Sequence, residues 1–163
     1  MKPAVLPVVL SLAIGCGAEV PKASQTQETA GGRLELGDKT AAGQCPVLLG
    51  GAVVLRIDCR TSYPPRVLGR FKGDFGRFEE VIVLQEQPMG NACNGGPLHF
   101  LGIRNNGHEV SGPIDFCGGA DPVLTHDGDR LRVTFPGGPP NRGETAAADE
   151  VWQYEDGRVT KVY

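Results

Sequence analysis

The sequence predicts a small all-β domain, an antiparallel sandwich or barrel of about seven or eight short strands held by two disulfides. Three observations support this fold class. The 163 residues include 24 Gly and 13 Pro, which is typical of a chain with many turns. The hydrophobic residues, 40% of the total, fall into short runs between these turn residues, as strands do. Four cysteines follow residue 44, an even number that suits a disulfide-bonded exported domain.

The first predicted strands lie in the middle of the chain. Val53–Ile57 is rich in β-branched residues, and Tyr63-Pro64-Pro65 then predicts a break, because proline lacks the backbone donor that a strand needs. The next predicted strands are Val67–Phe71 and Glu80–Leu84. Within the latter, Val81–Leu84 is apolar at consecutive positions, which indicates a central strand covered on both faces.

The C-terminal half predicts three hairpins, each with Asn or Asp followed by Gly at its turn. Their strands and turns are Leu98–Arg104 before Asn105-Asn106-Gly107, Val123–His126 and Arg130–Phe135 around Asp127-Gly128, and Val151–Tyr154 and Val159–Tyr163 around Asp156-Gly157. Leu131, Val133 and Phe135 alternate with polar residues, so this strand is expected to bury one face only. Trp152 and Tyr154 share a face and are expected to join the core.

The N-terminal residues have the pattern of a bacterial export signal. Lys2 precedes an apolar stretch from Ala4 to Ile14 that is too short to span a bilayer. The segment Leu12-Ala13-Ile14-Gly15-Cys16 resembles the lipobox of bacterial lipoproteins. This resemblance implies that residues 1–15 are a signal peptide and that Cys16 carries the lipid that anchors the protein to a membrane.

The residue after the lipidated cysteine bears on the expected location. Gly17 at this position implies sorting to the periplasmic face of the outer membrane. Cleavage after Ala18 is the alternative, and it would release a soluble periplasmic or secreted protein. In either case the chain is expected to act in the cell envelope or beyond it.

Polar residues dominate the stretch that follows. Residues 16–44 are predicted to be the lipidated N-terminus and a flexible tether, since only Leu34 and Leu36 form a brief apolar alternation there. The β domain is then predicted to comprise residues 45–163.

Four cysteines of this domain allow three disulfide pairings. We favour Cys45 with Cys59 and Cys93 with Cys117, because each pair brackets a predicted strand or hairpin. Each closed loop would stabilise the fold by about 3 kcal/mol in the chain-entropy model. A metal site is the alternative, but there is no Cys-x-x-Cys and no paired histidine spacing, so no metal or cofactor is predicted.

Charged residues near the predicted strands are expected to be ordinary surface groups. The three histidines, His99, His108 and His126, are predicted to be exposed at strand ends. The adjacent carboxylates Glu79 and Glu80 would point to opposite faces of a strand, which favours solvated charges over a shared catalytic site.

Two polar loops rich in Gly, Pro and Asn are the predicted binding surfaces. They are residues 85–97 and 136–143, the second followed by one predicted helical turn over Glu144–Asp149. The candidate binding residues in and beside them are Asn91, Asn94, His99, Asn141 and Arg142.

Composition and motifs point to binding rather than to catalysis. The net charge of -3 without clustered basic residues argues against a nucleic-acid partner. We therefore predict a non-enzymatic envelope lipoprotein that binds an envelope protein or component, as an inhibitor, an immunity-type protector or an assembly accessory. The alternative is a small secreted hydrolase with a spatially assembled site that includes His99.

Overall fold

The computed structural model describes residues 26–90, 93, 95–117, 120–137 and 148–163, and these ranges contain twelve strands in three four-stranded antiparallel sheets. The first sheet contains β1 (Thr26–Thr29), β2 (Gly32–Leu36), β3 (Gln44–Leu49) and β4 (Ala52–Asp58). The second contains β5 (Ser62–Phe75), β6 (Phe78–Pro88), β7 (Leu98–Arg104) and β8 (Gly107–Ile114). The third contains β9 (Val123–Asp127), β10 (Arg130–Phe135), β11 (Glu150–Glu155) and β12 (Arg158–Lys161).

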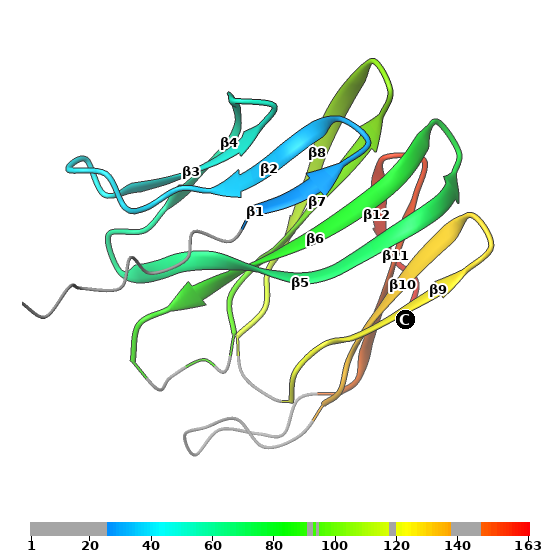
Figure 1. Ribbon diagram of the computed structural model, residues 1–163. Helices are drawn as coiled ribbons and strands as arrows, with labels where there is room; N and C mark the ends of the chain where they lie inside the picture. The colour runs from blue at the N-terminus through cyan, green and yellow to red at the C-terminus, as the bar shows by residue number, and fades with distance from the viewer. Residues whose placement is uncertain (1–25, 91–92, 94, 118–119, 138–147) are drawn as a thin grey trace, which may run out of the picture.

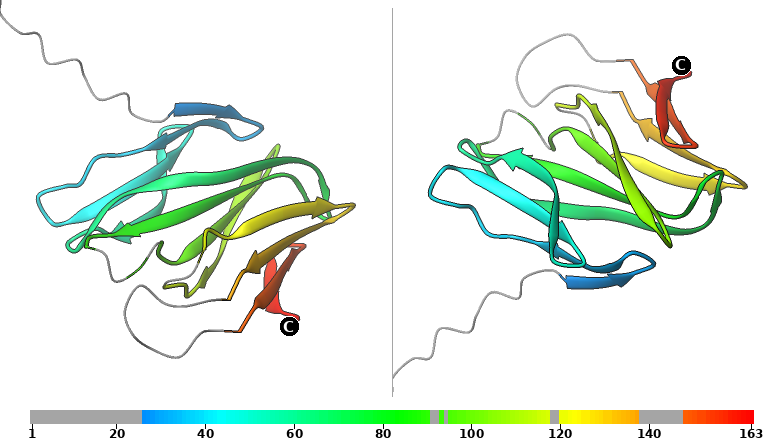
Figure 2. Two further views of the ribbon diagram at one scale, coloured as in Figure 1. Left: turned by 90° about the horizontal axis from the view of Figure 1, so that it is seen from below. Right: turned by 90° about the horizontal axis from the view of Figure 1, so that it is seen from above.

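The sheets are stacked in three layers, with the second sheet between the other two (Figure 1 and Figure 2). Each sheet is a meander in which neighbouring strands follow one another along the chain. The all-β class and the antiparallel pairing predicted from the sequence are confirmed, with twelve strands in place of about seven or eight. No helix long and apolar enough to cross a membrane occurs in the described ranges.

A first hydrophobic core fills the space between the first sheet and the near face of the second. Its buried members are Leu34, Leu36, Cys45, Val47, Leu49, Ile57, Cys59, Ile82, Leu84, Leu101 and Ile103. A second core lies between the opposite face of the second sheet and the third sheet. Its buried members are Phe75, Phe78, Val81, Val83, Leu98, Phe100, Ile114, Leu131, Val133, Phe135 and Tyr154.

The consecutive apolar residues of β6 are divided between these cores. Ile82 and Leu84 belong to the first core, whereas Val81 and Val83 belong to the second, and all four are fully buried. Successive side chains of a strand point to opposite faces, so β6 is covered on both sides. This confirms the central strand predicted from the same residues.

The predicted boundary between tether and domain is wrong. Residues 26–29 and 32–36, assigned to the tether, form β1 and β2, and Leu34 is 0% exposed. The prediction failed because two apolar residues alone do not indicate a strand. Here β3 supplies the backbone hydrogen-bond partners of β2 and apolar side chains that pack beside Leu34 and Leu36. The tether assignment for residues 16–25 lies outside the described residues.

A buried carboxylate fastens the β1–β2 turn to the second sheet. Glu80 is 1% exposed, forms an ion pair with Arg70, and accepts a hydrogen bond from the backbone N–H of Ala30 at 2.9 Å. The adjacent Glu79 is exposed, as expected for the opposite face of a strand. The prediction of a solvated charge therefore holds for Glu79 and is wrong for Glu80, because Arg70 and the Ala30 backbone replace its water.

Both predicted disulfides are present. Cys45 pairs with Cys59 across the end of the β3–β4 hairpin, and both residues are fully buried in the first core. Cys93 pairs with Cys117 and joins the chain after β6 to the chain after β8. The local pairing was predictable because each bridge closes a short loop of the chain, around β4 in one case and around the β7–β8 hairpin in the other.

The predicted break at Tyr63-Pro64-Pro65 is replaced by an irregular stretch of strand. β5 runs through these residues, and the register with β6 shifts between Tyr63 and Arg66. The prolines lie on an edge strand of the second sheet, where a missing backbone donor is tolerated. The two prolines are therefore accommodated by a local bulge, and the strand continues where a break was predicted.

The three predicted hairpins are confirmed, including the Asp156-Gly157 turn, where both residues have positive φ (44° and 79°). The burial of β10 alternates as expected, with Leu131, Val133 and Phe135 inside. Tyr154 is fully buried and stacks on Phe100 at 5.5 Å between ring centroids. Trp152 packs against the same core, as predicted. The predicted helical turn over 144–149 falls largely outside the described residues.

Tyr154 gives the fold an expected alkaline sensitivity. Burial, reinforced by the nearby charge of Glu109, raises the pKa of the Tyr154 phenol well above its usual value of 10. Above pH 10 the unfolded chain releases this proton while the folded protein retains it, so the free energy of unfolding falls as pH rises. The expected slope approaches about 1.4 kcal/mol per pH unit.

Urea unfolding between pH 8 and pH 11, followed by the fluorescence of the single tryptophan, measures this slope. Tyr154→Phe should reduce the slope, since it removes the titrating group. At pH 7 the same variant should change stability by less than about 1 kcal/mol, because the Tyr154 hydroxyl is buried without a hydrogen-bond partner. An unchanged alkaline slope in Tyr154→Phe would show that other groups cause it.

Candidate binding cleft

An open cleft of about 480 Å³ lies at the end of the second sheet where β5 begins and β6 ends. Figure 1 shows where these two strand ends lie in the fold. We call it the Arg66 cleft. The described residues that line it are Tyr63, Arg66, Gln85, Glu86, Gln87, Pro88, Gly90, Cys93, Gly95 and Asp121. Its volume lies in the range of about 300–1,000 Å³ that is usual for small-molecule sites.

The interior of the cleft contains an arginine with a fixed orientation. The Arg66 guanidinium donates from Nε and from Nη2 to the Gln85 side-chain oxygen, at 2.9 and 2.7 Å. The two residues are directly opposite each other in the β5–β6 register, so they project from the same face of the sheet. This pair of hydrogen bonds also fixes the orientation of the Gln85 amide.

That orientation leaves the Gln85 nitrogen without an acceptor. Gln85 is 1% exposed, and its Nε2 is buried with no hydrogen-bond partner. A buried donor without a partner costs about 1–3 kcal/mol. Gly95 covers this nitrogen closely, and a Cβ added at Gly95 would collide with it. A glycine is therefore required at this point of the cleft wall.

Asp121 balances the charge of Arg66. Its carboxylate lies 3.3 Å from Arg66 Nη2, and its side chain is 69% exposed, so it faces both the arginine and solvent. The other acidic residue of the lining, Glu86, has His99 as its partner. The cleft therefore contains donors and acceptors side by side, with no excess of positive charge.

Two exposed large apolar side chains lie at the rim of the cleft. Tyr63 is 56% exposed and Met89, on the adjoining strand end, is 46% exposed. Close by, Gln87 donates through Nε2 to the Pro64 carbonyl at 2.5 Å, which ties the start of β5 to the end of β6. The Gln87 amide oxygen is thereby left as an acceptor. Aromatic and polar groups thus alternate along this end of the sheet.

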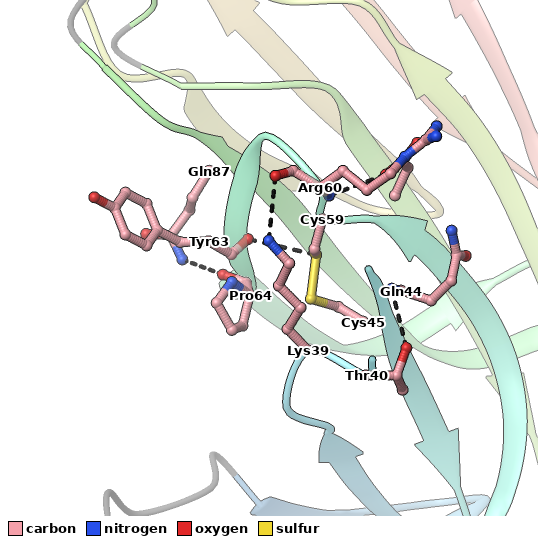
Figure 3. Close-up of a disulfide and its surroundings, with 10 residues drawn as sticks. Lys39, Thr40, Gln44, Cys45, Cys59, Arg60, Tyr63, Pro64 and Gln87 are labelled. Carbon is pink, nitrogen blue, oxygen red and sulfur yellow. Dashed lines mark hydrogen bonds and ion pairs between the residues drawn. A yellow bond between two sulfur atoms is a disulfide. The ribbon is translucent and has the colours of Figure 1, made fainter. Parts of the chain in front are cut away.

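Two disulfides hold the chain around the cleft. Figure 3 shows the start of β5, with Tyr63 and Pro64, beside the Cys45–Cys59 bridge, and the Tyr63 ring points away from the sulfur atoms. On the other side, Cys93 lines the cleft and is joined to Cys117. The wall that contains Cys93 is therefore covalently tied to the chain after β8, which favours a preformed site.

His99 corrects one prediction about the histidines. It is 8% exposed, and its Nε2 lies 2.7 Å from Glu86 Oε1, so it is a buried, paired residue rather than an exposed one. It lies opposite Leu84 on the face of β7 that points toward the first sheet. Packing against that sheet removes water from the imidazole ring, and the Glu86 carboxylate replaces the water as its hydrogen-bond partner. His108 and His126 are exposed, as predicted.

The structure locates the predicted binding residues only in part. Asn91, Asn94, Asn141 and Arg142 lie outside the described residues, and His99 is beside the cleft rather than in its lining. The predicted loop from Gln85 begins within β6, which extends to Pro88.

Sequence reasoning missed Arg66, Gln85 and Asp121. The sequence contained a clue for one of them. Gln85 directly follows the buried residues Val81–Leu84, and a buried polar side chain at such a position needs a hydrogen-bond partner. The partnership with Asp121 joins residues 55 positions apart and had no local sign.

Within the described ranges, no group of three or more His, Cys, Asp or Glu side chains is arranged to hold a metal ion. Comparison with protein-family models, with characterised proteins and with solved structures gives no match for this chain. The fold and the cleft therefore define the class: a disulfide-bonded, three-layered β protein with a polar cleft at one end of its central sheet.

Proposed function

We propose that this protein is an exported lipoprotein of the bacterial cell envelope, anchored through Cys16, and that it binds a component of the envelope in the Arg66 cleft. The observation that carries the proposal is the Arg66 guanidinium, which lines the open cleft and is held there by paired hydrogen bonds to Gln85 and by the Asp121 carboxylate. An arginine fixed in this way presents its remaining donors to the cleft in a set orientation.

Two further features support an exported binding protein. The lipobox-like segment ending at Cys16 implies export, and two disulfides suit an oxidising compartment. The polar side chains of the cleft are held by hydrogen bonds to one another, which is typical of a rigid recognition surface.

The alternative function, a small hydrolase, has one observation in its favour, the His99–Glu86 pair at 2.7 Å. A carboxylate that orients a histidine is part of many hydrolytic sites. A nucleophile must also lie within reach, and the described cleft lining contains no serine, while Cys93 is in a disulfide. Binding is therefore the better-supported function.

Site-specific photo-crosslinking in the envelope tests the proposal. A benzophenone amino acid in place of Tyr63, at the rim of the cleft, should give an adduct when the full-length protein is exported and irradiated. The matched control is the same amino acid in place of Asn105, which is exposed in the turn at the opposite end of the second sheet. It should give no such adduct.

Arg66→Ala in the Tyr63-labelled protein should reduce the adduct at least fivefold, because it removes the group that organises the cleft. Arg66→Lys should reduce it as well, since lysine keeps the charge but not the paired hydrogen bonds to Gln85. Equal adducts from positions 63 and 105, or an adduct insensitive to both substitutions, would contradict a binding role for the cleft.

A further inference from the structure

The chemistry of the Arg66 cleft narrows its ligand, given the proposed binding function on which this inference rests. We infer that the cleft binds a neutral pyranose unit of an envelope glycan through that sugar's hydroxyl groups. Four features of the described residues support this ligand class: the charge balance, the arrangement of donors and acceptors, the exposed aromatic rim and the prolines on the neighbouring strand edge.

The charge balance argues for a neutral ligand. The only cationic group of the described lining is Arg66, and Asp121 already lies 3.3 Å from its Nη2. A carboxylate or phosphate ligand would have to compete with Asp121 for the guanidinium and would also meet its negative charge. A hydroxyl group has no such conflict, because it carries no charge.

The hydrogen-bonding groups match adjacent hydroxyls. A sugar hydroxyl both donates and accepts, so it fits best where a donor and an acceptor lie side by side. The Arg66 guanidinium supplies donors, while the Asp121 carboxylate and the Gln87 oxygen supply acceptors. The hydrogen-bonding groups of two adjacent hydroxyls would therefore find partners on side chains that are already held in place.

The rim offers a surface for the apolar face of a sugar ring. Tyr63 is 56% exposed beside Pro88, and both line the cleft. A pyranose presents C–H groups on one face and hydroxyls at its edge, so an exposed aromatic ring next to polar side chains suits it. The exposure of Tyr63 therefore leaves its ring available for contact with a sugar.

A peptide ligand is disfavoured by the strand edge beside the cleft. Extended peptides commonly bind by adding a strand to a sheet edge through backbone hydrogen bonds. β5 is an edge of the second sheet, but Pro64 and Pro65 remove two backbone donors next to the cleft, and its register is irregular there. Recognition at this point must use side chains.

The test is a titration of the intact, disulfide-bonded full-length protein, purified from membranes and labelled with ¹⁵N. The probes are three neutral tetrasaccharides, namely cellotetraose, maltotetraose and tetra-N-acetylchitotetraose. The comparison probes are tetragalacturonate, inorganic phosphate and acetyl-tetraalanine amide. We expect at least one neutral sugar to shift the side-chain amide resonances of Gln85, and the comparison probes to leave them unchanged.

Variants give the sharpest outcome. Arg66→Ala should weaken sugar binding at least tenfold, whereas Arg33→Ala, at an exposed arginine of the first sheet, should leave it unchanged. Asp121→Asn alters only an exposed side chain and is not expected to disturb folding. It should weaken a hydroxyl ligand several-fold, because it replaces a charged acceptor, but it should strengthen an anionic one.

The inference is overturned if none of the three sugars moves the Gln85 resonances, if an anion or the peptide moves them instead, or if Asp121→Asn tightens binding. The proposed function has a separate readout. If position 63 gives an Arg66-dependent adduct but no sugar binds, the sugar is rejected as the ligand and the binding function of the cleft is retained. If neither the adduct nor sugar binding is observed, both the ligand class and the binding function are rejected.

Discussion

Leu34→Ala is expected to lower the free energy of unfolding by about 2–5 kcal/mol, because it removes a fully buried side chain from a close-packed core. Leu34 lies in β2, pairs with Leu49 of β3, and belongs to the core between the first and second sheets. The size of the effect would be a large fraction of the total stability of a domain of this size.

Urea unfolding of the full-length protein, followed by circular dichroism, measures this loss. Arg33→Ala is the matched control, since Arg33 is the neighbouring residue and is exposed. It should stay within about 0.5 kcal/mol of the unchanged protein. If Leu34→Ala were as harmless as its neighbour, residues 26–36 would be a tether after all, as their composition first suggested.

Glu80→Ala is expected to destabilise the protein by about 3 kcal/mol, because removing one partner of a buried ion pair leaves the other without compensation. Glu80 is 1% exposed and bonds both to Arg70 and to the backbone of Ala30. Its loss therefore affects the second sheet and the attachment of the β1–β2 turn together.

Glu79→Ala provides an unusually close control, since it deletes the same charge one residue away on the exposed face. Little change is expected from it. Hydrogen exchange would add a local readout, because Glu80→Ala should increase exchange at the Ala30 amide more than at amides of the third sheet. Equal stabilities of the two variants would mean that the Glu80 interactions contribute nothing net.

The position of the Arg66 cleft has consequences for how it would work. Arg66, Gln85 and Gln87 are carried by β5 and β6, and β6 is buried between two cores, so its backbone position is set by packing. The segment with Cys93, which completes one wall of the cleft, is tied by a disulfide to Cys117. Such a site is organised before any ligand arrives, which reduces the entropy lost on binding.

How far the fold could be predicted varies along the chain. Hairpins with Asn-Gly or Asp-Gly turns and alternating strands were predictable because turn chemistry and one-sided burial act locally. β1 and β2 were not, since Thr26–Thr29 is polar and becomes a strand by pairing with β2. β5 was underestimated because its prolines lie on a sheet edge, a position that only the sheet order reveals.

The candidate site was predicted less well than the fold. Cys93 was identified as a half-cystine within a predicted binding loop, and it does line the cleft. Arg66, Gln85 and Asp121 come from three separate segments, and a side-chain constellation of this kind has no spacing rule to reveal it. His99 was singled out, but as an exposed residue, whereas its pairing with Glu86 depends on the register between β6 and β7.

The sequence by itself determined the all-β class, the two disulfides and the central position of β6, because turn residues, cysteine parity and consecutive apolar residues each constrain the chain locally. Only the tertiary structure decided that twelve strands form three layers, that Glu80 is buried, and that Arg66, Gln85 and Asp121 meet in one cleft. The physical reason is that these features depend on which segments pack together, and non-local pairing can bury or unite residues whose own neighbours in the sequence give no sign of it.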